Sequence, residues 1–186
     1  MLSELESERF TSLIWNCVKY VRSSSQRLDN FREFSVLEQG KANANVPLDV
    51  VTRWNSTYLM LEAALKYEAT FNRMAEENCA FKSYFHEKDK FGNERVGPPS
   101  VDDWRNAEAF CVFLKKFYEA TLRLSAWKSI TSNILFVEMI TLQTDIDKAM
   151  LSEDIVLKRV ATSMKSKFNK YWGKFESINK IIMIAS

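Results

Sequence analysis

The stretch SVDDWRNAEAFCVFLKKFYEATLRLS, Ser100–Ser125, decides the fold class. Ser100 has the side chain of a helix N-cap, and Asp102 and Asp103 follow it, where the positive end of a helix dipole favours acidic groups. Apolar residues then recur every three or four positions, at Trp104, Ala107, Cys111, Leu114 and Tyr118. This spacing predicts a long amphipathic helix from about residue 101 to residue 125.

The same spacing extends to most of the chain on both sides of this helix. It predicts helices over about 3–22, a short one ending near 37, and others over 53–78, 135–150 and from 152 onward. Only four glycines and three prolines are present, which leaves few turn signals for a sheet. The sequence therefore predicts an all-α fold, an irregular multi-helix bundle.

At 186 residues the chain is long enough for one domain, or one and a fraction, and we expect a single helical domain over residues 1–186. Within it we expect N-terminal helices and a loop over 1–47, a helix that carries an Arg-Trp pair over 48–78, an exposed loop over 79–99 and a helical bundle over 100–186. The apolar run INKIIMIAS stops abruptly at Ser186. A run of this kind normally continues into a buried element, so we expect the chain to be part of something larger.

Bulk composition excludes several classes of protein. The three cysteines are widely spaced, which is typical of reduced thiols in an intracellular protein rather than of a disulfide framework. The first residues lack a basic start followed by an apolar core, so we expect no leader segment, and no apolar run reaches the roughly 18 residues that a membrane span needs. The net charge of +2 is too small to indicate nucleic acid unless the cations cluster locally.

Residues for catalysis are sparse, and we expect no enzyme, no metal site and no cofactor. The single histidine, His86, has no partner for a zinc site, and four glycines leave no Gly-rich phosphate loop. Two carboxylate pairs have simpler explanations than Mg²⁺ binding. Asp102 and Asp103 begin a helix, and Asp145 and Asp147 are two residues apart on a helix and so point to different faces.

Basic residues cluster near the end of the chain. Between Ile155 and Phe175 there are six positive residues and no negative ones. Four of them fall within about a quarter of the helix circumference at 100° per residue: Arg159, Lys167, Lys170 and Lys174. Such a stripe suits phosphate contacts, but a solvated helix face with lysines near its C-terminal end would look the same.

A second polar cluster begins a helix, in DVVTRWNSTYLML, Asp49–Leu61. A cap at Thr52 with Asn55 in the first turn accounts for two of its polar groups. Arg53 and Trp54 are not explained by capping, and together they offer a phosphate-binding guanidinium beside a flat stacking surface. A tryptophan packed under the loop with the arginine stacked on its ring is an equal alternative.

These residues also carry a family resemblance. The segment LDVVTRWNSTYLMLEAALKY, 48–67, closely resembles the Thr-Arg-Trp-Asn-Ser-Thr-Tyr segment of plant hAT-type (hobo/Activator) transposases, in particular the domesticated RICESLEEPER-like members that carry a BED zinc finger. Three further segments resemble the same family in the same order: VKYVRSSSQRLDNF at 18–31, VGPPSVDDWRNAEAFCVFLKKFYEATLRLS at 96–125 and VATSMKSKFNKYWGKFESIN at 160–179.

The resemblance implies a DNA-rearranging enzyme with an RNase-H-like core, whose two Asp and one Glu bind divalent metal and whose core is interrupted by a helical insertion. This chain resembles the insertion and its flanks, with the catalytic core expected outside it. The resemblance also implies a nuclear protein, and it places Arg53 and Trp54 near the active site with the tryptophan stacking on displaced DNA bases. Where the family often reads Ser-Gly-Ser-x-Tyr-Pro-Thr-Ser-Asn, this chain has SAWKSITSN, 125–133, and that loss of Gly and Pro puts any role of the turn in doubt.

We therefore expect a non-catalytic fragment of a domesticated or decayed transposase that retains DNA-binding capacity. The candidate DNA contacts are Arg53, Trp54, Asn55, Arg159, Lys167, Lys170 and Lys174. The alternative is a protein-interaction or oligomerisation module with no DNA role, in which an exposed apolar surface binds a protein partner or a second copy of the chain.

Overall fold

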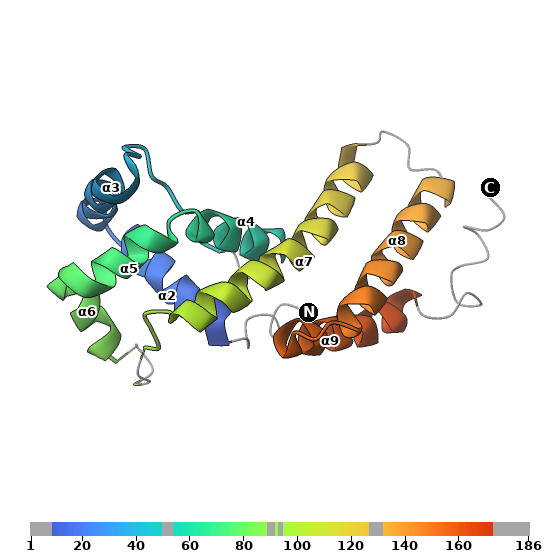
Figure 1. Ribbon diagram of the computed structural model, residues 1–186. Coiled ribbons are helices and arrows are strands. Elements are labelled where there is room, and N and C mark those ends of the chain that lie inside the picture. Colours follow the sequence, from blue (N-terminus) through green and yellow to red (C-terminus); the bar gives the residue numbers. More distant parts are fainter. Residues whose placement is uncertain (1–8, 50–53, 89–91, 93–94, 127–131, 173–186) are drawn as a thin grey trace. The chain divides into compact units, whose positions relative to one another are not determined.

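The computed structural model of the chain describes residues 9–49, 54–88, 92, 95–126 and 132–172. In those ranges the regular elements are eight α-helices (Figure 1). They are α2 (Arg9–Arg22), α3 (Ser25–Gln39), α4 (Trp54–Leu65), α5 (Glu68–Glu77), α6 (Cys79–His86), α7 (Val101–Ala126), α8 (Ser132–Met150) and α9 (Ile155–Trp172). The predicted all-α fold is confirmed. No helix among these residues is both long enough and apolar enough to cross a membrane.

The helices group into two compact units along the chain, with the boundary inside α7 between Cys111 and Val112. The first unit holds α2 to α6 and the beginning of α7. The second unit holds the rest of α7 together with α8 and α9. The expectation of one helical domain over residues 1–186 stays a prediction, and the two units are described separately.

Helix α2 supplies much of the core of the first unit through one wide apolar face. It contacts both α3 and α4. Its buried residues are Phe10, Thr11, Leu13, Ile14, Cys17, Val18, Tyr20 and Val21. At 100° per residue these residues cover about half of the helix circumference, so α2 packs this face against its neighbours and leaves Arg9, Lys19 and Arg22 exposed on the other.

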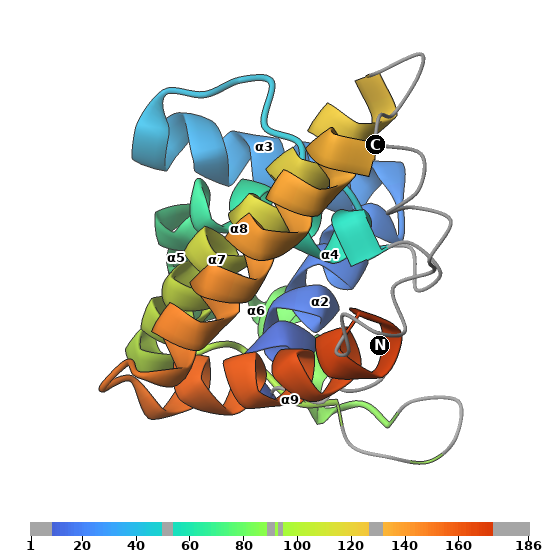
Figure 2. The same ribbon diagram turned by 90° about the vertical axis from the view of Figure 1, so that its right-hand side faces the viewer.

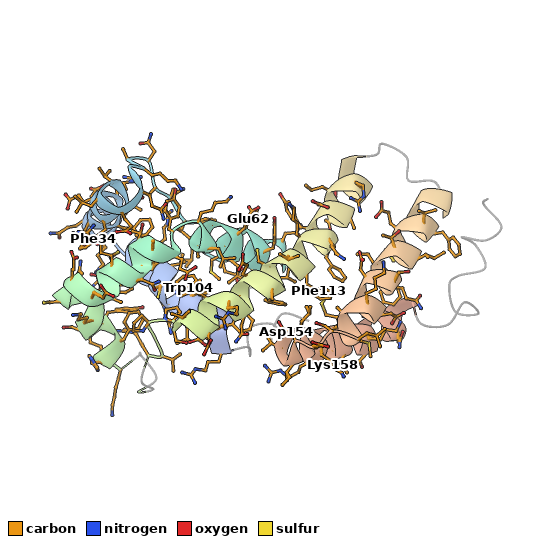
Figure 3. All side chains as sticks on the ribbon, in the orientation of Figure 1. Phe34, Glu62, Trp104, Phe113, Asp154 and Lys158 are labelled. Atoms are coloured by element: carbon orange, nitrogen blue, oxygen red, sulfur yellow. The ribbon has the colours of Figure 1, made fainter. Side chains whose placement is uncertain are left out.

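Aromatic rings connect the other helices of the first unit. The ring of Phe71 on α5 lies 5.1 Å from Phe31 on α3, 6.5 Å from Phe81 on α6 and 6.1 Å from Trp104 on α7, measured between ring centroids. Trp104 points from α7 into the unit (Figure 3), and its indole N–H donates to Asn72 Oδ1 at 3.1 Å. Each such ring pair stabilises the fold by roughly 0.5–1.5 kcal/mol beyond the area that it buries.

The start of α7 confirms the predicted capping. Ser100 Oγ accepts a hydrogen bond from the backbone N–H of Asp103 at 3.3 Å, and Asp103 Oδ2 accepts one from the backbone N–H of Ser100 at 2.9 Å. This reciprocal pair satisfies two of the backbone donors that a helix N-terminus leaves open. The observed helix, Val101–Ala126, agrees with the predicted range of 101–125.

The prediction of an exposed loop over 79–99 is wrong for its first part, because residues 79–86 form α6. Asn78 begins this helix by accepting a hydrogen bond from the backbone N–H of Phe81 at 2.9 Å. Phe81, Tyr84 and Phe85 are buried on one face of it. Eight residues hold only about two turns, which is too short a helical period to stand out beside the charged run that follows.

The predicted single helix over 53–78 is interrupted. Helix α4 ends at Leu65 and α5 begins at Glu68, with the backbone N–H of Tyr67 donating to the carbonyl of Ala64 at 2.9 Å. The ring of Tyr67 packs against Phe31 of α3, with centroids 5.4 Å apart. Neither Gly nor Pro marks this break, so the packing of Tyr67 outweighs the local helical preference.

The second unit combines buried apolar residues, among them Ile146 of α8 and Val160 of α9, with ion pairs between its helices. Helix α8 runs back beside the second half of α7 (Figures 1 and 2), where Arg123 donates to both carboxylate oxygens of Glu138 at 2.6 and 2.9 Å. Helix α9 then packs on α8. Asp154 Oδ1 accepts hydrogen bonds from the backbone N–H groups of Val156 and Leu157, so α9 begins three residues after the predicted start at Ser152.

Candidate nucleic-acid interface

The Arg-Trp pair lies where the chain enters α4. Trp54 is the first residue of this helix, and its side chain lies outside the described part of the structure, as does the whole of Arg53. The next turns of α4 are anchored in the core of the first unit, because Tyr58, Met60 and Leu61 are almost completely buried. The pair therefore stands at the start of a helix whose position is fixed by packing, with Arg53 before its first residue and Trp54 as that residue.

A buried carboxylate organises this helix start. Asp49 is only 7% exposed, and it accepts hydrogen bonds from the hydroxyl of Ser56 and, at 3.0 Å, from the hydroxyl of Thr57, which is itself fully buried. A buried carboxylate is stable only when donors replace its lost hydration, and these hydroxyls provide them. We call these three residues the Asp49 clamp. It joins the residue before segment 50–53 to the first turn of α4.

The clamp explains polar residues that the sequence left without a role. Asp49 lies five positions before Trp54, and the two residues that donate hydrogen bonds to it, Ser56 and Thr57, lie seven and eight positions after it. Helix capping uses shorter spacings than these. Sequence reasoning therefore looked to Thr52, which lies outside the described residues, and missed Asp49. The detectable signal was an acidic residue in an otherwise apolar stretch, LDVV, before two consecutive hydroxyl residues.

Asn55 occupies the position between Trp54 and the clamp. Its side chain is half-buried, and its carbonyl oxygen is buried with no hydrogen-bond partner among the described residues. Most buried acceptors in folded proteins are paired. The protein itself covers this oxygen, so any contact that Asn55 makes with a ligand would have to use the amide NH₂ group.

The basic cluster lies on α9 in the second unit. Arg159 is exposed, while Lys167 and Lys170 lie on α9 with side chains that are not described, and Lys174 lies outside the described residues. Lys165 is not available as a surface cation, because its ammonium group pairs with Asp147 on α8 at 2.7 Å. Lys158 is exposed near the start of the helix (Figure 3).

The carboxylates that a metal site would need are engaged elsewhere. Asp102 pairs with Arg105 at 3.2 Å, and Asp103 caps α7. Asp145 pairs with Lys116 of α7 at 2.7 Å. In the described ranges, no group of three or more His, Cys, Asp or Glu side chains is arranged to hold a metal ion.

The first unit also has an open groove of about 670 Å³ whose lining contains none of the candidate residues. Its lining residues are Tyr20, Gln26, Arg27, Asp29, Asn30, Glu33 and Ala80. Burial raises the pKa of Tyr20, and the guanidinium of Arg27, 4.3 Å from the centre of that ring, partly opposes the rise. The groove mixes acidic and basic groups and so favours no single class of ligand.

Two family models match the chain. The first, described as the ZBED1 RNase-like helical domain, matches residues 5–113, and its end lies close to the boundary between the two compact units. The second, described as the hAT-like transposase, RNase-H fold, matches residues 133–186. No solved structure matches the chain.

Curated relatives match most of the chain. The zinc finger BED domain-containing protein RICESLEEPER 3 of Oryza sativa subsp. japonica is 34% identical over 168 residues, which are 90% of this chain and 20% of that protein. DAYSLEEPER of Arabidopsis thaliana is 31% identical, over 77% of this chain and 19% of that protein. A putative AC transposase of Zea mays is 32% identical, over 68% of this chain and 14% of that protein. The chain thus spans about a fifth or less of the length of these relatives.

Proposed function

The chain belongs to the plant hAT-type transposase family, and on this premise we propose that it is a non-catalytic, transposase-derived segment that binds DNA through Arg53 and Trp54. The observation that carries the proposal is the position of this pair at the start of a core-anchored helix whose first turn is tied to Asp49. A protein that acts on DNA in this way would work in the nucleus.

The chemistry of the pair suits an unpaired or distorted strand. A guanidinium binds phosphate oxygens through two parallel N–H donors, and an indole ring stacks on any base regardless of sequence. Asn55 adds a side-chain amide, whose NH₂ group would donate a hydrogen bond to a base edge. Single-stranded or hairpin DNA is therefore the expected ligand, because a base inside a duplex has no free face for stacking.

The cations of α9 form a second, weaker surface in this proposal. Arg159, Lys167, Lys170 and Lys174 would contact phosphates only, and such contacts carry no sequence information. We expect these cations to add affinity for DNA that decreases as the salt concentration rises.

The proposal that the segment does not cut DNA is supported by the engagement of its carboxylates. Asp102, Asp145 and Asp147 each pair with a cation, and Asp103 caps α7. The test is incubation of the 186-residue chain with hairpin DNA and either Mg²⁺ or Mn²⁺. We expect intact DNA, and metal-dependent cleavage products would contradict the non-catalytic assignment.

The DNA proposal is tested by binding of a fluorescent hairpin with a single-stranded tail, measured by anisotropy at increasing salt. We expect measurable affinity at low salt and a linear fall in log K with log salt, with a slope of about −0.7 for each single-strand phosphate contacted. Trp54→Ala is expected to lose about 1–3 kcal/mol of binding free energy, the value of one base stacked on an aromatic ring.

Trp15→Ala is the matched control, because Trp15 is a half-buried indole of the same unit that lies outside the Arg-Trp segment. We expect it to bind DNA like the parent once circular dichroism shows that it is folded. Absence of binding at low salt, or affinity independent of salt, would refute the DNA proposal.

A specific observation favours one alternative, a protein-interaction module. Val112 and Leu122 on α7 and Val137 and Ile140 on α8 are large apolar residues that are 46–62% exposed in the second unit. Exposed apolar residues of this kind are typical of association surfaces. Sedimentation over a range of concentrations separates the two functions: a dimer that dissociates on Val137→Glu, combined with no DNA binding, would favour the alternative.

A further inference from the structure

Among the described residues of the first unit, four arginines are partly buried, and Arg27 is the one without a carboxylate partner. The other three each pair with a carboxylate at between 2.9 and 3.3 Å: Arg32 with Asp29, Arg73 with Glu38 and Glu77, and Arg95 with Glu87. A partly buried guanidinium has lost some of its hydration, and pairing with an anion compensates for that loss. The unpaired charge of Arg27 is therefore the place in this unit where an anion from outside fits best.

Two tyrosine rings support the guanidinium of Arg27. Its Cζ lies 4.3 Å from the centre of the Tyr20 ring and 5.8 Å from the centre of the Tyr84 ring, and both tyrosines are almost completely buried. Its Nη1 group donates to the hydroxyl of Ser23 at 2.8 Å. A guanidinium that is already stacked and hydrogen-bonded loses little conformational entropy when it binds a ligand.

One edge of the Arg27 guanidinium is open. Ser23 uses Nη1, whereas Nε and Nη2 have no hydrogen-bond partner among the described residues. Arg123 in the second unit uses the same two atoms to bind both carboxylate oxygens of Glu138, at 2.6 and 2.9 Å. These parallel donors match two oxygens of a phosphate equally well. Arg27 lines the open groove of about 670 Å³, so a ligand has access to it.

The acidic residues of the same groove do not neutralise Arg27. Asp29 pairs with Arg32 at 3.0 Å, and Glu33 lies about 120° round α3 from Arg27 at 100° per residue. In the other direction the chain reads RSSSQR over 22–27, with two arginines, exposed serines and no acidic residue. The groove as a whole favours no single class of ligand, but its Arg27 end favours an anion.

We propose that Arg27 binds a backbone phosphate of the DNA strand, an inference that rests on the proposed function above. The contact consists of the Nε and Nη2 donors on two oxygens of one phosphate. Arg27 offers these donors from one side only, so a phosphate binds well there when other contacts of the same molecule add to it, as they do on a strand. The contact positions the strand and reads no sequence.

Two substitutions of Arg27 separate its charge from its geometry. Arg27→Gln removes the charge, and we expect the affinity of the full chain for the hairpin probe to fall about tenfold. The slope of log K against log salt should become shallower by about 0.7. Arg27→Lys keeps the charge but not the parallel donors, so we expect the parent's slope and a smaller loss of affinity. A general loss of stability would not give this pattern.

Arg105→Gln is the matched control. Arg105 is an arginine of the same unit with 74% of its side chain accessible, and it pairs with Asp102. The substitution removes the same charge, and we expect the parent's slope and an affinity within about twofold of the parent, because exposed charges are screened. Circular dichroism and urea denaturation check that all three variants are folded. Equal losses in Arg27→Gln and Arg105→Gln would overturn the inference, because binding would then follow net charge alone.

Chemical modification locates the contact without a substitution. Phenylglyoxal modifies accessible guanidinium groups, and mass spectrometry of the peptides reports on each arginine separately. We expect hairpin DNA to protect Arg27 at low salt and to leave Arg105 reactive. Inorganic phosphate at the same concentration of phosphate groups should not protect Arg27. Protection by inorganic phosphate but not by DNA would mean that the site binds a free anion, and the assignment to a strand would be wrong.

The outcomes distinguish this inference from the function on which it rests. If Trp54→Ala weakens binding but Arg27→Gln binds like the parent, the Arg27 contact is wrong and the proposed function stands. If Arg27→Gln weakens binding but Trp54→Ala does not, the Arg27 contact stands and the assignment to the Arg-Trp pair fails. If the parent shows no salt-dependent binding, both fail.

Discussion

At the scale of single residues, the three cysteines occupy different environments. Cys17 and Cys111 are buried, and burial raises the pKa of the Cys17 thiol well above its ordinary value, whereas Cys79 is exposed at the start of α6. Because the thiolate is the reactive form, only Cys79 should react quickly with a thiol reagent in the folded protein. We expect one fast-reacting thiol per chain in native buffer and three in denaturant.

Cys79→Ser provides the control for this labelling and should abolish the fast phase. Fast modification of Cys17 in the native protein would contradict the packing described for α2. Mass spectrometry of the labelled peptides assigns each site directly.

Asp49 shows what sequence reasoning can and cannot find at this scale. The Arg53–Trp54 pair stood out because helix capping does not account for an arginine next to a tryptophan. The Asp49 clamp did not stand out, because its hydrogen bonds connect residues seven and eight positions apart across segment 50–53. Local propensity rules cover spacings of three and four, and contacts beyond that range depend on how the chain turns.

At the scale of elements, the N-cap residue and the apolar period of the sequence together predicted α7 almost to the residue, whereas they did not predict α6. Helix α6 is held by tertiary contacts, since Phe81 lies 5.0 Å from Tyr20 of α2 and 6.5 Å from Phe71 of α5 between ring centroids. A helix of eight residues has little stability of its own, so packing decides whether it forms. Short elements of this kind are therefore the least predictable from sequence.

The contribution of α6 to stability is measurable. We expect Phe81→Ala to lower the free energy of unfolding by about 3–5 kcal/mol, because it leaves a cavity where a fully buried ring was. Urea denaturation of the variant and the parent gives this difference. Ser83→Ala, on the exposed side of the same helix, is the control and should change stability by less than about 0.5 kcal/mol. Equal stability of Phe81→Ala and the parent would mean that residues 79–86 do not pack as described.

The contact between α7 and α8 makes the stability of the second unit dependent on pH. The hydrogen bonds from Arg123 hold the pKa of Glu138 below its ordinary value of 4.5. A depressed pKa means that the contact stabilises the fold fully above pH 4.5, and that this stability is lost as pH falls through the lowered folded-state pKa. Glu138→Gln should therefore be less stable than the parent at neutral pH and should lose less stability on acidification.

Urea unfolding at pH values above and below 4.5 measures the difference in free energy of unfolding between Glu138→Gln and the parent. Glu153→Gln, an exposed glutamate of the same unit, is the control and should follow the parent. Parallel pH profiles for Glu138→Gln and the parent would show that the Arg123 contact does not stabilise the folded state.

Helix α9 offers an internal comparison for the proposed second DNA surface. Lys170 belongs to the basic quarter of the helix, whereas Lys158 is an exposed lysine outside it. Lys170→Ala should weaken hairpin binding and make the salt slope shallower by about 0.7, and Lys158→Ala should have a smaller effect. Equal effects of the two substitutions would mean that α9 acts only through its total charge.

At the scale of the whole molecule, the helical fold class was predictable, but the division into two units was not. The boundary lies within α7, between Cys111 and Val112, where the helical period continues without a glycine, proline or change in composition. Sequence signals mark where elements end, and here one element continues through the boundary. The net charge of +2 likewise hides the local clusters on which the DNA proposal depends.

The most direct test of the central claim is photo-crosslinking of a hairpin that carries 5-iodouracil in its single-stranded tail, followed by mass spectrometry of the crosslinked peptides. The account predicts a crosslink at Trp54 that disappears in Trp54→Ala and decreases as salt rises. Crosslinks that form only at other residues of the chain, with none at Trp54, would contradict it.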